Sequence, residues 1–197
     1  MQMVRVSREQ AAANRETLVD AAGRLFRVRG VDGVGVAEVA KEAGLTHGAL
    51  YAHFPSKEML AAEALKSGMQ KSLSDVKASA GGAEPTLGGY LDFLLSRHMR
   101  DAMEEGCPMT ASGSEIARGS AEVSRSFAEG FENMVAALAA AAPPQMADDE
   151  RRALAITAIA AELGAIVISR GILKSDPALA DGVLETVRAR LGDVLGA

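Results

Sequence analysis

Glycine and proline residues divide this sequence into nine stretches, and each stretch carries apolar residues at the spacing of a helical face. In the first stretch, Leu18, Ala22 and Leu25 follow one another at intervals of four and three. Gly30 suits the end of that helix, and no stretch alternates convincingly with period two. The pattern predicts an all-α protein with nine helices, at residues 8–29, 36–43, 46–54, 57–80, 86–104, 108–119, 121–141, 148–173 and 176–195.

The composition supports a globular helical protein. Hydrophobic residues make up 48% of the 197 residues, enough for a sizeable core in one large domain or two small ones. Aromatic residues are only 4% and tryptophan is absent, which disfavours a β-sandwich or barrel. The single cysteine excludes a disulfide within the chain and fits a reducing cytosol. Glu162 and Arg170 interrupt the apolar run 153–173, so we expect a buried helix there, a cytoplasmic protein and no membrane partner.

Charge is distributed unevenly along the chain. The formal net charge of −5 by itself disfavours nucleic-acid binding. Residues 1–66, however, hold 9 Lys/Arg and 8 Asp/Glu, a net of +1, whereas residues 67–197 hold 12 and 18, a net of −6. Arg5, Arg8 and Arg15 gather near the start, where a short basic arm would meet phosphates or a minor groove. A solvated surface explains these arginines equally well.

Two short helical stretches, 36–43 and 46–54, are joined by a sharp turn at Gly44. Glycine tolerates the positive φ that such a turn needs, and the arrangement is typical of a helix-turn-helix. In that motif the N-terminal residues of the second helix meet the edges of bases in the major groove. The candidate DNA-binding residues, at that position and beside it, are Arg8, Thr46, His47, Gly48, Ala49, Tyr51, His53 and Lys57.

These residue types suit different parts of a DNA contact. Thr46 is a helix cap in any case and also a phosphate donor. Gly48 and Ala49 are small, so they allow close approach and contact with a thymine methyl group. His47 is expected at a base or a phosphate, with an idle surface histidine as the alternative. Tyr51 is expected on the flank near phosphates, although part of its ring is also suited to the core.

The residues around this turn resemble a known family. Residues 22–26 (Ala-Gly-Arg-Leu-Phe), Gly30 and residues 36–58, which end in Leu-Tyr-Ala-His-Phe-Pro-Ser-Lys-Glu, are similar to the DNA-binding signature of TetR/AcrR-type regulators. The resemblance implies a nine-helix, Ω-shaped homodimer in which the first three helices bind DNA and the last two form a four-helix interface between subunits. It implies a helix-turn-helix domain over residues 1–66 and a ligand-sensing, dimerising domain over residues 67–197.

The turn Gly106-Cys107-Pro108 is the most informative feature outside the helix-turn-helix. Cys107 is expected at a helix N-terminus, where the partial positive charge lowers a thiol pKa and favours the thiolate. The turn also resembles that of a subgroup of the family with members that respond to electrophiles or oxidants. We therefore consider Cys107 a candidate sensor, and the alternative is a small buried residue that fills space.

Flexible and aromatic side chains among the middle helices are candidates for a ligand pocket, with ordinary core as the alternative for each one. They are Met69, Leu73, Leu94, Met99, Met103, Met109, Phe127, Phe131 and Met134. The last two helices carry more apolar surface than one face needs, partly at near-heptad spacing, which predicts a dimer interface. Its candidate residues are Leu163, Ile166, Val183, Val187, Leu191 and Val194.

The sequence therefore predicts a repressor that binds double-stranded DNA as a homodimer at an inverted-repeat operator. An unknown small molecule, or an electrophile or oxidant, is expected to release it. The alternative is an activator or architectural regulator of the same fold that acts without a ligand. His47, His53 and His98 form no metal-binding spacing, and there is no phosphate loop, so no enzyme activity, cofactor or metal is expected.

Overall fold

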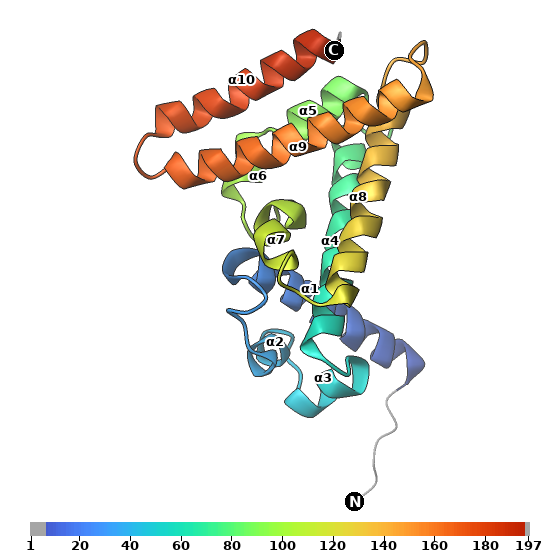
Figure 1. Cartoon of the computed structure of the whole chain (residues 1–197). Helices are drawn as coiled ribbons and strands as arrows, with labels where there is room; N and C mark the ends of the chain where they lie inside the picture. Colours follow the sequence, from blue (N-terminus) through green and yellow to red (C-terminus); the bar gives the residue numbers. More distant parts are fainter. Residues whose placement is uncertain (1–6, 196–197) are drawn as a thin grey trace, which may run out of the picture.

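The computed structural model describes residues 7–195, apart from the side chains of Ser114, Val194 and Leu195. Over this range every regular element is a helix, which confirms the all-α prediction (Figure 1). The expected roles of Arg5 and Val194 lie outside what the structure describes. The helices are α1 (Arg8–Arg29), α2 (Val36–Glu42), α3 (His47–His53), α4 (Lys57–Ser79), α5 (Leu87–Leu94), α6 (Arg97–Asp101), α7 (Pro108–Ile116), α8 (Ala121–Ala141), α9 (Asp148–Ile172) and α10 (Pro177–Leu195).

The structure divides one predicted helix, 86–104, into two. Ser96 is extended at φ −80° and ψ 154°, and its Oγ accepts a hydrogen bond from the amide N–H of Met99 at 3.1 Å. A serine in this geometry caps a new helix because its hydroxyl satisfies a free amide of the first turn. α5 therefore ends at Leu94 and α6 begins at Arg97, so the described chain has ten helices where the pattern predicts nine.

Residues 7–66, which we call the head, have an apolar centre of their own. α1, α2 and α3 contact one another, and the start of α4 packs against α1. Leu18, Val39 and Leu50 are completely buried in this centre, and Phe54 is 2% exposed. Burial of these side chains fixes α3 at the end of the molecule farthest from α9 and α10 (Figure 1).

α4 joins the head to residues 67–195, which we call the body. It packs against α1 near its start and against α8 along its length. Figure 1 shows α4 and α8 side by side, with α9 and α10 lying across their far ends. Since α4 is one uninterrupted helix, the position of the head depends on how α4 is packed at both of its ends.

α9 is apolar on two faces. It is long and apolar enough, by length and composition only, to cross a membrane, and 39% of that stretch is buried inside the protein. One face packs against α6, α7, α8 and α10, with Ala158, Ile159 and Ile166 each 1% exposed. The prediction of a buried helix for 153–173 therefore holds for this face only, since Ile156, Val167 and Ile168 of the same helix are 36–55% exposed.

Candidate nucleic-acid interface

The turn between α2 and α3 has the geometry that its residues favour. Gly44 has a φ of 67°, and the next amide N–H, of Leu45, donates to the carbonyl oxygen of Ala40 at 2.8 Å. Thr46 is extended, and its Oγ1 accepts a hydrogen bond from the amide N–H of Ala49 at 3.2 Å. The chain thus leaves α2, reverses direction and begins α3 with a capped first turn.

The first turn of α3 is open to solvent. Thr46, His47 and Gly48 are exposed, and a Cβ added to Gly48 would meet nothing within 4 Å. Tyr51 is 44% exposed, and its ring lies edge-on to the ring of His47 with 5.0 Å between centroids. Ala49 is half-buried, and the next residue, Leu50, is completely buried and holds the helix to the head. The surface is polar, and Gly48 and Ala49 add no bulky side chain to it.

The cations around α3 differ in their surroundings. Arg8 is exposed at the first residue of α1, and His53 is half-buried in the last turn of α3. Arg15 is engaged within the head, since its guanidinium lies 4.9 Å from the Phe54 ring centroid and 3.1 Å from a Glu63 oxygen. Lys57 begins α4 and also lines a cavity, described below.

The residues predicted to form a ligand pocket are mostly packed. Met69, Met99 and Met109 are 2–4% exposed, and a hollow beside Met69 and Leu73 measures about 20 Å³. Leu94 and Met134 are buried as well, while Phe127 and Phe131 are partly buried against the core. Met103 is 41% exposed, because it lies in the loop after α6. In this state these side chains form core and surface rather than the wall of a cavity.

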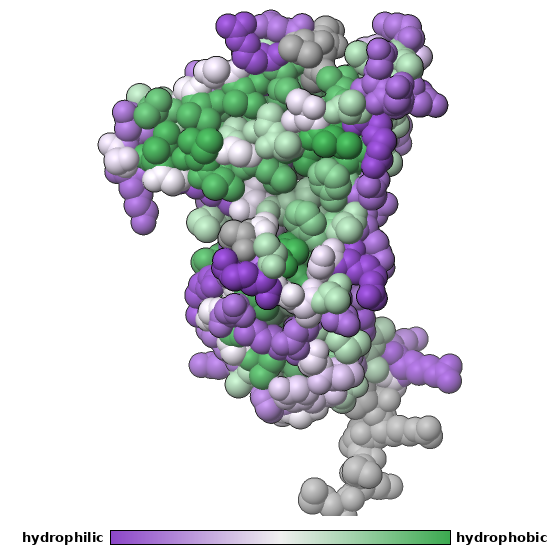
Figure 2. All heavy atoms as spheres, viewed as in Figure 1, coloured by the Kyte–Doolittle hydropathy of each residue, from purple (hydrophilic) through white to green (hydrophobic). Residues whose placement is uncertain are grey.

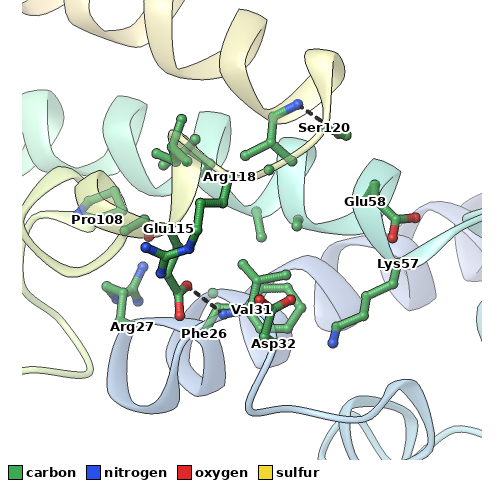
Figure 3. Close-up of a pocket in the computed structure, with 18 residues that line it drawn as sticks. Phe26, Arg27, Val31, Asp32, Lys57, Glu58, Pro108, Glu115, Arg118 and Ser120 are labelled. Carbon is green, nitrogen blue, oxygen red and sulfur yellow. Dashed lines mark hydrogen bonds between the residues drawn. The ribbon is translucent and has the colours of Figure 1, made fainter.

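A larger cavity, of about 380 Å³, lies where the head meets the body (Figure 3). Its walls come from α1, the α1–α2 loop, the start of α4, α7, the α7–α8 link and the first turn of α8. Phe26, Leu65 and Val123 contribute apolar surface, and Arg27, Glu115 and Arg118 contribute charge. The sequence prediction missed this cavity because its lining comes from six separate segments with no shared spacing.

Cys107 takes its predicted position but not its predicted chemistry. It is the N-cap residue of α7, with Pro108 in the first turn, yet it is only 2% exposed. Burial first, and the nearby Glu162 second, raise the pKa of its thiol to about 12, and hydrogen bonds from the Met109 and Thr110 backbone only partly oppose this shift. The expectation of a thiolate near neutral pH is therefore wrong, because desolvation outweighs the helix end.

The body contains a buried polar centre that the sequence prediction also missed. Arg170 in α9 donates from Nε to the carbonyl oxygen of Arg100 and from Nη2 to that of Met99, both at 2.8 Å, and contacts Thr110 Oγ1 at 3.2 Å. It thus joins α9 to the last turn of α6 and the first turn of α7. Burial lowers the pKa of Arg170, and nearby Cys107 and Glu162 oppose that shift.

Two further residues complete the polar centre. Arg100, 4% exposed, pairs through Nη1 with Asp181 of α10 at 2.7 Å and through Nε with Asp101 at 2.6 Å. Glu162 is 2% exposed and its Oε1 has no hydrogen-bond partner among the described residues. Burial raises the pKa of Glu162 to about 8. In the sequence, Glu162 and Arg170 stand out only as interruptions of an apolar run.

The candidate interface residues fall into two groups. Leu163, Val183 and Val187 are partly buried and border the surface. Ile166, at 1% exposure, belongs to the core of the subunit, and Leu191 is 9% exposed, so neither offers much area to a partner. The exposed apolar side chains on these helices are instead Ile156, Val167, Ile168 and Leu179, at 36–55% exposure. Figure 2 shows an extensive hydrophobic surface over the region of α9 and α10.

Comparison with known proteins places this helix-turn-helix in a family. The model of bacterial regulatory proteins, tetR family, matches residues 18–64. The HTH-type transcriptional regulator AcrR of Shigella flexneri is 41% identical over 61 residues, 31% of this chain and 28% of that protein. LmrA of Bacillus subtilis, with the same description, is 47% identical over 53 residues, 26% of this chain and 28% of that protein. The matched region thus spans little more than a quarter of these relatives.

Solved structures extend the likeness to the whole fold. A TetR-family transcriptional regulator from Cytophaga hutchinsonii has a TM-score of 0.74 at 20% identity, covering 96% of this chain and 98% of that one. The reduced form of Escherichia coli NemR has a TM-score of 0.70 at 20% identity, covering 91% and 95%. The arrangement of helices and the head together define a helix-turn-helix regulator fold. The likeness in sequence to the tetR family of regulators is thus confined to residues 18–64, and over the rest of the chain the likeness is one of fold.

Proposed function

We propose that this protein is a transcriptional repressor that binds operator DNA as a homodimer and is released by a small molecule. The observation that carries the proposal is the open first turn of α3, with exposed Thr46, His47 and Gly48, inside the family-matched segment. Among the relatives is a HTH-type transcriptional repressor, KstR2 of Mycolicibacterium smegmatis, 39% identical over 57 residues. In this proposal residues 1–66 bind DNA, residues 67–197 sense the effector and dimerise, and the protein acts in the cytoplasm.

The contacts with DNA are assigned by position. His47, Gly48 and Ala49 enter the major groove and meet base edges, since they open the second helix of the motif. Thr46, Tyr51, His53, Lys57 and Arg8 contact phosphates on either side. Two heads related by a two-fold axis require two half-sites in an inverted repeat, about 34 Å apart centre to centre.

A DNA-binding experiment tests these assignments. In a mobility-shift titration on the chain's own upstream DNA, Lys57→Ala is expected to weaken binding and reduce the slope of log affinity against log salt by about one unit. Lys174→Ala, a change of the same type at an exposed site far from α3, is the control and leaves both unchanged. His47→Ala is expected to alter sequence preference. An unchanged salt slope for Lys57→Ala would refute its phosphate contact, and failure to bind any inverted repeat would refute the proposal.

The dimer is proposed to form through the exposed side of α9 and α10. On α9, Ile156, Ala160, Gly164 and Val167 lie along one side with exposed or half-exposed apolar or small side chains and no charge among them. Spacing of three and four residues makes this a continuous stripe, and an obligate interface is large and apolar.

Sedimentation equilibrium tests the interface. Val167→Asp would bury a carboxylate in the interface and is expected to weaken dimerisation about 100-fold or more. Val28→Asp, at an exposed valine of α1, is the matched control and keeps the dimer. A wild-type protein that is monomeric at micromolar concentration, or a Val167→Asp variant that dimerises normally, would refute this interface.

A further inference from the structure

The wall of the cavity between the head and the body contains a positively charged side chain, Arg27, that forms no ion pair within residues 7–195. Arg27 of α1 donates from Nε to the carbonyl oxygen of Glu104, in the loop before α7, at 2.6 Å. A Cβ on Gly68 of α4 would lie 3.0 Å from its Nη1 and 3.2 Å from Cγ of Pro108. The guanidinium is therefore held where α1, α4 and α7 meet, at the wall of the cavity.

Arg27 is only partly satisfied. Within residues 7–195 no ion pair is recorded for it, and the Nε bond to Glu104 is its one recorded hydrogen bond. Burial lowers its pKa, so water solvates this cation poorly. A partly desolvated guanidinium with free N–H groups favours an anion that bonds to both of its edges.

Glu115 lies next to Arg27 and Arg118 in the cavity (Figure 3). Its Oε2 accepts a hydrogen bond from the amide N–H of Val31 at 2.9 Å, which ties α7 of the body to the α1–α2 loop of the head. Gly30, with φ 75°, makes room for this contact, since a Cβ there would overlap the Glu115 carboxylate. A carboxylate that bound Arg27 from the cavity would repel Glu115 and weaken the link to Val31.

The other residues that line the cavity indicate the size, polarity and charge of a ligand that would fit it. Phe26, Leu65 and Val123 form an apolar wall, and about 380 Å³ is in the size range of small-molecule pockets. Two other carboxylates line the cavity, Asp32 and Glu58, but both are exposed to water. Among the half-buried charged residues of the lining, Arg27 and Lys57 are cations, and Glu115, which already accepts from the Val31 amide, is the one carboxylate; this balance favours an anionic ligand over a cationic one.

We infer that this junction cavity is the effector site, and that it takes a small molecule with an apolar body and one carboxylate. The carboxylate pairs with Arg27 and Arg118, and the apolar body lies against Phe26, Leu65 and Val123. Occupation loosens the contact between Glu115 and Val31 and so frees the head from α7. The inference rests on the proposed function only for the consequence for DNA, since ligand binding is measured without DNA.

Calorimetric titration of the full-length protein tests the chemistry. The probes are 4-phenylbutyrate and decanoate, each beside the alcohol and the amine of the same carbon skeleton. The carboxylates are expected to bind about tenfold or more tightly than the matching alcohols and amines, because only they form charge-assisted hydrogen bonds with Arg27. Equal affinities within each set, or no binding of either carboxylate, would overturn the inference.

Two variants locate the site. Arg27→Gln is expected to reduce carboxylate affinity about tenfold or more and leave the alcohols unchanged. Arg125→Gln, which removes an exposed arginine of α8 outside the cavity, is the control and has no effect. Arg118 is exposed, so Arg118→Gln keeps the fold and is expected to lose about twofold to fivefold even if Arg27→Gln does not fold. Carboxylate binding unaffected by Arg118→Gln and by any folded Arg27 variant would overturn the assignment.

The DNA readout separates this inference from the proposed function. Saturating carboxylate is expected to weaken operator binding about tenfold. If the protein binds DNA but binds no carboxylate, the effector site is refuted and the repressor proposal stands. If it binds carboxylates through Arg27 but binds no DNA, the repressor proposal is refuted and the site stands.

Discussion

The head and the body place their polar side chains in opposite ways. In the head, Thr46, His47 and Tyr51 are exposed at one end of a short helix, above an apolar centre that contains Leu50. In the body, Arg100 and Glu162 are buried and Arg170 is half-buried, and the two arginines join helices far apart in sequence. The first arrangement offers polar groups to an outside partner, and the second uses them to hold α6, α7, α9 and α10 together.

The largest expected effect on stability comes from shortening Leu50, the buried side chain that supports the exposed surface of α3. Leu50→Ala leaves every polar group of α3 in place but empties a site that is completely buried. We expect it to lower the free energy of unfolding by about 2–5 kcal/mol, as large-to-small core changes do. Thermal or urea unfolding followed by circular dichroism measures this.

The neighbouring residue supplies the control. Tyr51→Ala, at 44% exposure, is expected to change stability by less than about 1 kcal/mol while still affecting DNA binding. If Tyr51→Ala destabilised the protein as much as Leu50→Ala, the division of α3 into an apolar supporting side and a polar outer side would be incorrect.

The buried polar centre predicts a pH dependence of stability. The pKa of Glu162 is about 8 in the folded protein, above its ordinary value of 4.5. Between these two values the folded state keeps a proton that the unfolded chain releases, so the free energy of unfolding falls as pH rises from about 4.5 to about 8. Glu162→Gln cannot ionise, and at pH 8 it is expected to be more stable than the wild type by about 1–3 kcal/mol.

Unfolding in urea across that pH range distinguishes Glu162 from other groups. Glu129→Gln changes an exposed glutamate of α8 and is expected to keep the wild-type pH slope. A Glu162→Gln variant whose slope equals that of the wild type would show that this carboxyl is not the titrating group.

A smaller effect is expected at the start of α3. Thr46→Ala removes the hydroxyl that accepts from the Ala49 amide, at a cost of about 1 kcal/mol. Thr46→Ser keeps the hydroxyl and is expected to restore most of the stability. If the serine variant were as unstable as the alanine variant, the threonine methyl group, and not the cap, would be responsible.

The contrast between head and body explains what the sequence predicted. The cap at Thr46, the turn at Gly44 and the spacing of apolar residues act within a few neighbours, so α1, α2 and α3 were predicted almost to the residue. The same local chemistry operates at Ser96, whose hydroxyl caps a new helix. The apolar spacing continues across this serine, so the pattern predicted one helix where the structure has two.

The body was predicted less well, because its structure depends on contacts between residues far apart in the sequence, and no local pattern indicates such contacts. Arg170 lies about 70 positions from the carbonyl groups that it binds, and the junction cavity combines Arg27 with Arg118. The buried methionines were identified as apolar, but whether such a side chain fills the core or lines a cavity is decided by its neighbours in three dimensions. Ile166 was placed in an interface for the same reason, and lies in the subunit core.

The smallest expected effect concerns Cys107, whose helix-end position would suggest a reactive thiol. Because burial raises the pKa of this thiol to about 12, the folded protein carries it protonated at pH 7. The thiol is also 2% exposed, so an electrophile reaches it only when α7 opens. We expect N-ethylmaleimide, followed by intact mass, to label the folded protein far more slowly than the urea-unfolded chain, and to leave operator binding unchanged. Labelling of the folded protein at the unfolded rate, with release of DNA that Cys107→Ser prevents, would show that Cys107 is a sensor and that the body opens far more readily than its buried polar centre implies.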